Sequence, residues 1–358
     1  MTRFIGAVAA SLFLLLATQS QPASAWHRGP VETFAVLPDY APGVPENSEG
    51  LAVCLDGNIY APSGGFNADG FVPGPAKLWV FNPDGHLIRT VTLTGTAPPV
   101  LGLAFNPVTG FAFIADLGNG SLFKWDPVHN VTTLVQALGT NAGPNAIAFD
   151  AAGNVYVSDS FQGIIWKTDK NGNNLTQWVP SNPLLTPATG LNPPFGANGI
   201  EFNAARSAMF VANTANHTII KIPVNSNGTA GTPALFTTGI NAPDGIAIDR
   251  HDNLWVDANQ EDEIVVIDPT GKVIAKLGDF RGIDADGTPK GLLFPASPAF
   301  SRDGKWIYTS NFALNLPCAG AQAAIDSAWT LEAKHFTISR LKAEIPPLGH
   351  RDHDRDHH

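Results

Sequence analysis

Basic residues are scarce in this chain of 358 residues, in which 21 Lys and Arg stand against 31 Asp and Glu and the formal net charge is −10. Such an acidic protein has no counterion-release term to drive binding to phosphate backbones, and anionic membranes repel it. We therefore expect neither nucleic acid nor a membrane as a partner.

Long apolar runs are also scarce. The first residues have a basic start at Arg3, an apolar stretch over 7–18 and a small-residue cleavage motif that ends at Ala25. This pattern predicts a signal peptide over 1–25, cleaved near Ala25 and Trp26, and hence a secreted or periplasmic protein. After this segment the sequence has no further run of about 18 apolar residues, the length that a membrane-spanning helix needs. The His- and Asp-rich tail 346–358 is expected to be a disordered end that could hold a transition metal weakly.

Helical periodicity is nearly absent as well, and only 321–333 favours a short helix. Turn-forming residues are abundant instead, with 35 Gly and 29 Pro, which favours an all-β fold. A short apolar strand, a turn and a second strand recur along the chain, and the residue just before the first strand differs from copy to copy, as with Asp244 in Asp244-Gly-Ile-Ala-Ile. The first positions of the six copies, called the slot positions below, are Glu49, Leu101, Asn145, Asn198, Asp244 and Ala296.

The slot positions are spaced 52, 44, 53, 46 and 52 residues apart. Repeats of about this period are typical of β-propellers, in which each repeat forms one four-stranded blade. The sequence therefore predicts an all-β, six-bladed β-propeller with four-stranded blades, formed as a single domain over 26–345.

Closure of the ring can be predicted from the strands that are left over. The last repeat has a run at 335–341 but lacks a fourth strand, and a spare strand at 31–37 precedes the first repeat. We expect this N-terminal strand to complete the last blade, which leaves no sheet edge open. Cys54 in the first repeat and Cys318 after the last are candidates for a disulfide across the closure; two buried thiols are the alternative.

Four slot positions carry oxygen donors, namely Glu49, Asn145, Asn198 and Asp244. Because equivalent positions of the inner strands surround the channel, these side chains should converge at one mouth. Hard oxygen ligands without Cys or His suit Ca²⁺ best, with Zn²⁺ or Mn²⁺ as alternatives, and two carboxylates match a divalent charge. The alternative is that each residue merely caps a turn.

A second set of polar residues lies near the ends of the second strands. We interpret these as turn and inter-blade hydrogen-bonding residues: Asp116, Asp159, Asn213, Asp257 and Asn311.

The segments Glu49-Gly-Leu, Pro144-Asn145-Ala-Ile, Ala197-Asn198-Gly-Ile and Pro243-Asp244-Gly-Ile-Ala-Ile-Asp resemble, in this order, the SMP-30/gluconolactonase/LRE family of six-bladed propellers, whose strand framework is shared with NHL-type repeats. The resemblance covers roughly 49–311. It implies one divalent metal, usually calcium or zinc, bound by the four slot residues, and Asp244 as the general base of lactone hydrolysis.

The chain departs from that pattern at two positions. The sugar-lactone members carry an Arg two residues before the first Asn and an Asp directly after it, whereas this chain has Gly143 and Ala146. The apolar loops 66–71 and 193–195 also indicate a less polar ligand.

Three hypotheses follow. The first is a secreted, metal-dependent hydrolase that acts on a small-molecule lactone or other ester. The second is a non-catalytic NHL-type propeller that binds a protein partner, and the third is a metal-dependent lyase, as virginiamycin lyases show for this architecture. Loss of turnover in Asp244→Ala with the metal retained would favour the first.

Overall fold

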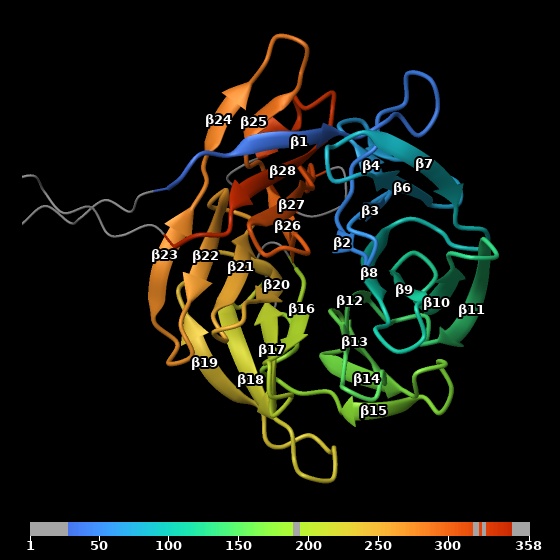
Figure 1. Cartoon of the computed structure of the whole chain (residues 1–358), viewed down its shortest axis with the longest axis vertical. Helices are drawn as coiled ribbons and strands as arrows, with labels where there is room; N and C mark the ends of the chain where they lie inside the picture. Colours follow the sequence, from blue (N-terminus) through green and yellow to red (C-terminus); the bar gives the residue numbers. More distant parts are fainter. Residues whose placement is uncertain (1–27, 189–193, 318–321, 324–326, 346–358) are drawn as a thin grey trace, which may run out of the picture.

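Six four-stranded antiparallel sheets stand around a common axis, like the blades of a propeller (Figure 1). The computed structural model describes residues 28–188, 194–317, 322–323 and 327–345. The prediction of an all-β, six-bladed propeller with four-stranded blades is confirmed.

Each blade runs from an inner strand at the channel to an outer strand at the rim. Blade one consists of β2 Ala52–Val53, β3 Ile59–Pro62, β6 Lys77–Phe81 and β7 Leu87–Thr92. Blade two consists of β8 Val100–Phe105, β9 Ala112–Asp116, β10 Ser121–Asp126 and β11 Val131–Ala137. Blade three consists of β12 Pro144–Phe149, β13 Val155–Asp159, β14 Ile164–Thr168 and β15 Thr176–Val179.

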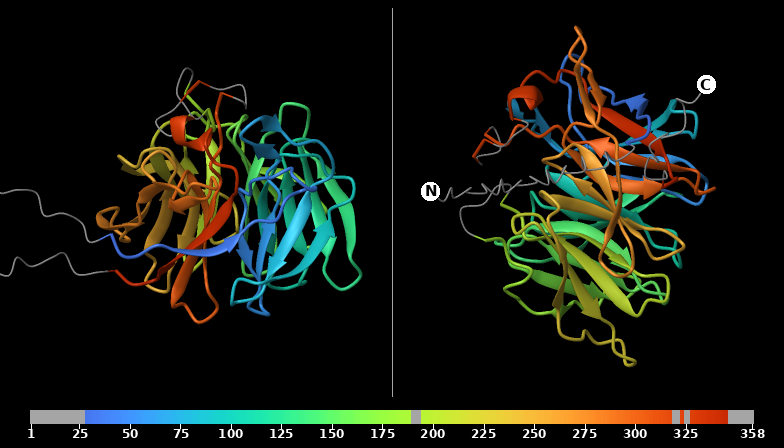
Figure 2. Two further views of the ribbon diagram at one scale, coloured as in Figure 1. Left: turned by 90° about the horizontal axis from the view of Figure 1, so that it is seen from above. Right: turned by 90° about the vertical axis from the view of Figure 1, so that its left-hand side faces the viewer.

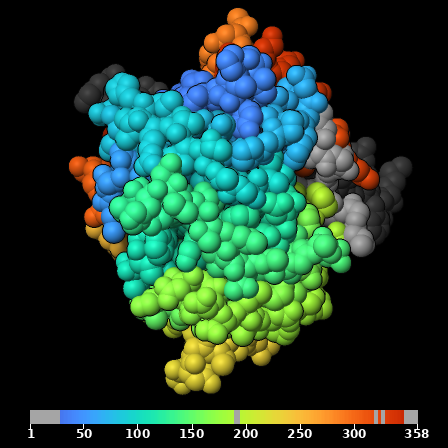
Figure 3. Space-filling model, turned by 90° about the vertical axis from the view of Figure 1, so that its right-hand side faces the viewer, coloured from blue at the N-terminus to red at the C-terminus, as the bar shows by residue number. Residues whose placement is uncertain are grey.

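The remaining blades follow in chain order. Blade four consists of β16 Ala197–Phe202, β17 Ala208–Asn213, β18 Thr218–Pro223 and β19 Ala234–Thr238. Blade five consists of β20 Pro243–Ile248, β21 Leu254–Ala258, β22 Glu263–Ile267 and β23 Val273–Leu277. Blade six consists of β26 Pro295–Phe300, β27 Trp306–Asn311, β28 Thr337–Lys342 and β1 Glu32–Val36. Consecutive blades lie side by side over the surface (Figure 3).

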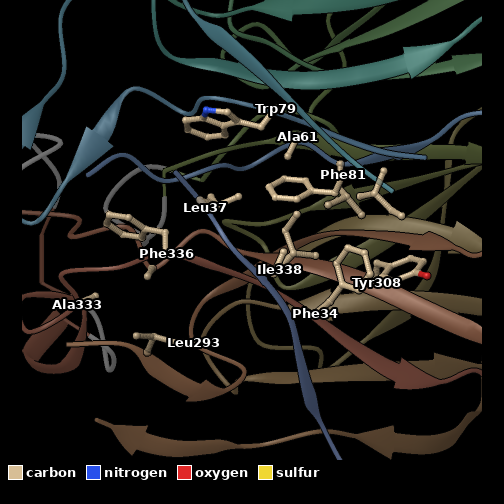
Figure 4. Close-up of a cluster of buried hydrophobic side chains, with 14 residues drawn as sticks. Phe34, Leu37, Ala61, Trp79, Phe81, Leu293, Tyr308, Ala333, Phe336 and Ile338 are labelled. Atoms are coloured by element: carbon tan, nitrogen blue, oxygen red, sulfur yellow. The ribbon is translucent and has the colours of Figure 1, made fainter. Parts of the chain in front are cut away.

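The N-terminal strand closes the ring, as the count of strands predicts. β1 pairs antiparallel with β28, with Glu32 opposite Arg340, so both ends of the described chain share one sheet (Figure 2). Apolar side chains reinforce the closure, because Phe34 of β1 packs edge-on against Tyr308 of blade six at 4.7 Å and shares a buried cluster with Trp79 and Phe81 of blade one (Figure 4). Burial of aromatic side chains stabilises such a junction strongly.

Three elements lie outside the blades. A short hairpin of β4 Phe66–Asn67 and β5 Gly70–Phe71 interrupts blade one, and a second hairpin of β24 Phe280–Ile283 and β25 Pro289–Gly291 separates blades five and six. The helix α1 Ser327–Thr330 falls inside the stretch where a helix was expected. In the described part of the chain, no helix is both long enough and apolar enough to span a membrane.

Some expectations fall on residues that the structure does not describe. These are the signal peptide 1–25, the tail 346–358, and Cys318 with its pairing to Cys54. They stay predictions.

Candidate active site at the mouth of the channel

The four polar slot residues line one cavity of about 160 Å³, together with Asn259 and several apolar side chains. Glu49, Asn145, Asn198 and Asp244 are 2–4% exposed and come from four different blades, so they converge as their equivalent positions predict. Leu101, a slot residue whose side chain has no oxygen donor, lines the same cavity. The other end of the channel opens into a cavity of about 400 Å³, where the charges of Glu201 and Arg206 offset each other over 3.2 Å.

A local irregularity of the inner strands aims the slot side chains at the axis. In β12, β16 and β20 the pairing with the second strand shifts register around the slot, between Pro144 and Ile147 in β12 for example. Such bulges remove a residue from the regular alternation of side chains and re-aim it. The slot residue therefore leaves the ladder and points into the channel mouth.

Glycine directly after the slot lets neighbouring inner strands approach closely. A Cβ on Gly199 would lie 2.2 Å from the carbonyl oxygen of Asp244, and a Cβ on Gly102 would lie 2.0 Å from that of Asn145. No side chain fits at these distances, so the glycine after the slot fixes how closely these inner strands approach each other.

The orientation of the Asn198 amide follows from its neighbours. The Thr214 hydroxyl donates its proton to the carbonyl oxygen of Pro243 at 2.8 Å, so it can only accept from Asn198, whose Nδ2 lies 2.9 Å away. This assigns Nδ2 to Thr214 and leaves Asn198 Oδ1 for the cavity. Among the described residues, Oδ1 of Asn198 has no hydrogen-bond partner.

Asp244 is held in a similar way by a residue that the sequence analysis missed. Asn259 donates both Nδ2 protons, one to Asp244 Oδ2 at 2.8 Å and one to the Pro295 carbonyl oxygen at 2.6 Å. Within the described chain, Asp244 Oδ1 has no partner. Each of two neighbouring blades therefore presents one orphaned oxygen at the cavity.

Negative charge accumulates around this cavity. Burial raises the pKa of Glu49 well above its usual value, and the nearby carboxylates of Asp244 and Asp257 raise it further. Burial also raises the pKa of Asp244 to about 7, although the side-chain amides of Asn259 and Asn198 lower it. Among the described residues that line the cavity there is no Lys, Arg or His to offset these carboxylates.

Asp257 differs from the other residues near the second-strand ends. Asp116, Asp159, Asn213 and Asn311 accept or donate turn and inter-blade bonds as expected. In blade five it is Ala258 that pairs with Pro243, the residue before the slot. Asp257 comes one residue earlier in the strand, so its side chain points to the opposite face of the sheet. It is fully buried and accepts a hydrogen bond from Thr309 Oγ1 of blade six at 2.5 Å, and within the described residues it makes no turn bond.

The donor set fits a hard divalent cation. Two carboxylates and two amide oxygens surround one cavity, two of those oxygens are buried without a partner, and burying them uncompensated is costly. No group of three or more His, Cys, Asp or Glu suited to a metal occurs in the described residues, so any cation there would rely on both amides. Solvent or a ligand would complete the six to eight oxygens that Ca²⁺ takes.

The structure also shows where Gly143 and Ala146, the two departures from the family pattern, are located. Gly143 lies directly before β12 with the ring of Phe161 over it, and Ala146 lines the opposite end of the channel. Of the two loops expected to be apolar, Phe66 and Phe195 line the cavity, whereas Pro193 lies outside the described residues.

Part of the chain matches a known sequence family. A sequence model of the SMP-30/Gluconolactonase/LRE-like region matches residues 191–278, which contain blades four and five with Asn198 and Asp244. The chain resembles the SMP-30/gluconolactonase/LRE-like propellers. This likeness is the one expected from the slot motifs, and the matched segment contains two of the four polar slot residues.

Solved structures and a curated relative widen the comparison. A gluconolactonase from Xanthomonas campestris has a TM-score of 0.60 at 12% identity, over 89% of this chain and 92% of that one. The calcium-binding protein regucalcin from Agrobacterium tumefaciens has a TM-score of 0.59 at 17% identity, over 86% and 94%. At such identities the likeness shows the fold alone. NHL repeat-containing protein 3 of Mus musculus is 30% identical over 178 residues, 46% of this chain and 48% of the mouse protein, so the match spans about half of that relative.

Proposed function

We propose that this protein is a secreted, divalent-metal-dependent hydrolase of a lactone or another ester, with one cation, Ca²⁺ by preference, held by Glu49, Asn145, Asn198 and Asp244. The observation that carries the proposal is the pair of orphaned oxygens, Asn198 Oδ1 and Asp244 Oδ1, in a buried cavity with two carboxylates. Two proteins that share this fold support the proposal by what they are named for, a gluconolactonase for the lactone and the calcium-binding regucalcin for the cation.

A cation bound there would supply Lewis acidity toward the ester carbonyl. The chain itself supplies Asp244 as the general base, oriented by Asn259 and with a pKa raised by burial to about 7, which suits proton abstraction from water near neutral pH. A cation lowers the pKa of a carboxylate that it contacts. Burial, and after it the nearby carboxylate of Asp244, raise the pKa of Glu49 as well.

The reaction balances without any further reactant. One water adds to the acyl carbon as the acyl C–O bond of the ester breaks. Asp244 takes one proton from that water and passes it to the leaving alkoxide, and the acid product then releases its proton to solvent.

The test is proton release by the mature protein with a panel of sugar, aliphatic and aromatic lactones, first with Ca²⁺ and then with excess chelator. We expect turnover that disappears with chelator, returns with Ca²⁺ and is lost in Asp244→Asn. Turnover that persists in excess chelator, or none on any substrate with Ca²⁺ bound, would contradict the proposal.

The NHL-type binding module is the second candidate, and the 30% identity to NHL repeat-containing protein 3 favours it. Under that hypothesis the cation stiffens the channel mouth and a loop face binds a protein partner. The result that favours this alternative is one bound Ca²⁺ per chain without turnover of any ester or lactone.

A further inference from the structure

Apolar rings form the walls of the channel-mouth cavity above its polar base. Among the described residues, five phenylalanines line it, and they come from the β4–β5 hairpin and from segments that flank the blade strands: Phe66, Phe161, Phe195, Phe294 and Phe312. Below them lie the slot oxygens described above. A ligand in this cavity must therefore present one polar end to the base and an apolar body to the walls.

One wall is a stacked pair of rings at the cavity mouth. Phe161 and Phe195 lie with their centroids 5.8 Å apart and their planes at 24°. Phe161 is 45% exposed, so burial within the fold alone does not account for its position. An exposed aromatic side chain at the rim of a cavity is available to stack on a ligand.

The position of Phe161 is fixed by the backbone around it. A Cβ on Gly143 would stand 2.7 Å from two carbon atoms of the Phe161 ring, so the ring occupies the space that any other residue at 143 would need. Asp159 ties the two together, because its Oδ1 accepts the backbone N–H of Gly143 at 2.9 Å and that of Phe161 at 3.2 Å.

The facing wall is fixed in a comparable way. Asn47 Oδ1 accepts the N–H of Phe66 at 3.2 Å, its Nδ2 donates to the carbonyl oxygen of Phe312 at 2.9 Å, and its own N–H donates to the carbonyl oxygen of Phe66 at 2.9 Å. The rings of Phe66 and Phe312 are 6.5 Å apart and nearly perpendicular. Asn47 thus fixes the backbone of both phenylalanines and, through it, the positions of their rings.

Volume and charge narrow the ligand further. A cavity of roughly 150 Å³ in an apolar protein interior accommodates a benzene-sized molecule, and this cavity has about 160 Å³. The described lining residues include no Lys, Arg or His that could pair with an acidic group, and the apolar walls offer no donors for a ring of hydroxyls. Both polyhydroxylated and acidic substrates fit poorly.

We propose that the substrate is a ring-sized, uncharged, apolar lactone or ester whose body lies between Phe161 with Phe195 on one side and Phe66 on the other, with Gly143 and Phe161 as the determinants of specificity. This inference rests on the proposed function for the hydrolytic step only. Binding of the apolar body depends on the walls alone.

The test combines turnover with binding. Dihydrocoumarin and glucono-δ-lactone serve as substrates, and 3,4-dihydro-2-quinolinone, a lactam of the same shape as dihydrocoumarin, serves as a binding probe measured by calorimetry. We expect kcat/KM for dihydrocoumarin to exceed that for gluconolactone at least tenfold. Phe161→Ala and Gly143→Ala should each weaken lactam binding about tenfold, one by removing the ring and the other by displacing it.

Phe236→Ala is the matched control, because Phe236 packs on Phe210 at the outer strand of blade four and does not line the cavity. It should leave lactam binding unchanged. If wild type binds the lactam, Phe161→Ala does not, and no ester is turned over, the result would support an apolar ring-sized ligand and contradict the proposed hydrolase activity. Faster turnover of gluconolactone than of dihydrocoumarin would overturn this inference and keep the hydrolase. Equal lactam binding by wild type and Phe161→Ala, or none by either, would overturn the inference.

Discussion

Asn259 donates a hydrogen bond from Nδ2 to Asp244 Oδ2 at 2.8 Å and a second one to the Pro295 carbonyl oxygen of the next blade at 2.6 Å. The same side chain therefore orients a candidate ligand and joins blade five to blade six. Since Oδ2 is engaged, Asp244 offers its other oxygen, Oδ1, to the cavity.

Removing Asn259 should loosen the ligand without removing it. We expect Asn259→Ala to weaken Ca²⁺ binding by about 10- to 100-fold, the usual effect of losing an outer partner of a metal ligand. Calorimetric titration measures this. Asn154→Ala is the control, because Asn154 makes the same 2.8 Å amide–carboxylate bond to Asp150 in a turn. An equal loss of affinity in both variants would show that the effect is not local.

Gly199 should tolerate no side chain. A methyl group there would stand 2.2 Å from the Asp244 carbonyl oxygen, so Gly199→Ala must push two inner strands apart. We expect a loss of about 3 kcal/mol or more in the free energy of unfolding, at the upper end for overpacking, together with weaker Ca²⁺ binding. Urea unfolding measures the first.

Ala146→Gly provides the reverse change at the equivalent position of blade three. It should cost at most about 1 kcal/mol, through backbone entropy. A Gly199→Ala variant as stable as wild type would refute the close-approach account.

Asp257 should influence the site through its charge. It is fully buried and the repulsion between it and Asp244 raises its pKa, after the larger effect of burial. Asp257→Asn keeps an acceptor for Thr309 and removes the charge of the ionised carboxylate, so we expect Ca²⁺ affinity to fall by roughly 3- to 10-fold when it is measured above the raised pKa of Asp257. Unchanged affinity in calorimetry would mean that this carboxylate does not act on the site.

Asp116 should make stability depend on pH. Burial raises its pKa from 3.8 to about 6. A raised pKa in the folded state gives stability that is fully present below about pH 4 and is lost as pH rises through about 6, because charging the buried group then opposes folding. Two pKa units correspond to about 3 kcal/mol. Urea unfolding should therefore show that, on going from pH 7 to pH 4, the free energy of unfolding of wild type rises relative to that of Asp116→Asn by about this amount. A difference between the two proteins that does not change with pH would contradict the raised pKa of Asp116.

The slot residues and the ring closure could be predicted because both are repeated or counted in the sequence. Glu49, Asn145, Asn198 and Asp244 precede apolar strands of one pattern, and equivalent inner positions of a propeller must converge. The N-terminal strand was the one unit left to complete blade six. Neither conclusion needs side-chain detail.

Asn259 and the place of Asp257 could have been found from an ungapped alignment of the second strands. Aligning Val157-Ser-Asp-Ser160, Val211-Ala-Asn-Thr214 and Val256-Asp-Ala-Asn259 sets Asn259 beside Ser160 and Thr214, each of which also bonds a carbonyl oxygen of the next blade. Asp257 then falls one position earlier than Asn213. The Phe161–Gly143 contact could not have been predicted, because Phe161 stands in the turn between β13 and β14 where blades four and five have Ala215 and Gln260, so no repeated residue signals it.

The central claim is that the channel mouth binds one divalent cation through the four slot residues, and calorimetric titration of the mature protein with Ca²⁺ tests it most directly. We predict one bound Ca²⁺ per chain, abolished in Asp244→Asn and strongly weakened in Asn198→Ala, with Asp268→Asn, an exposed turn acid, as the control that binds normally. No bound Ca²⁺, or the same affinity in Asp244→Asn as in wild type, would contradict it.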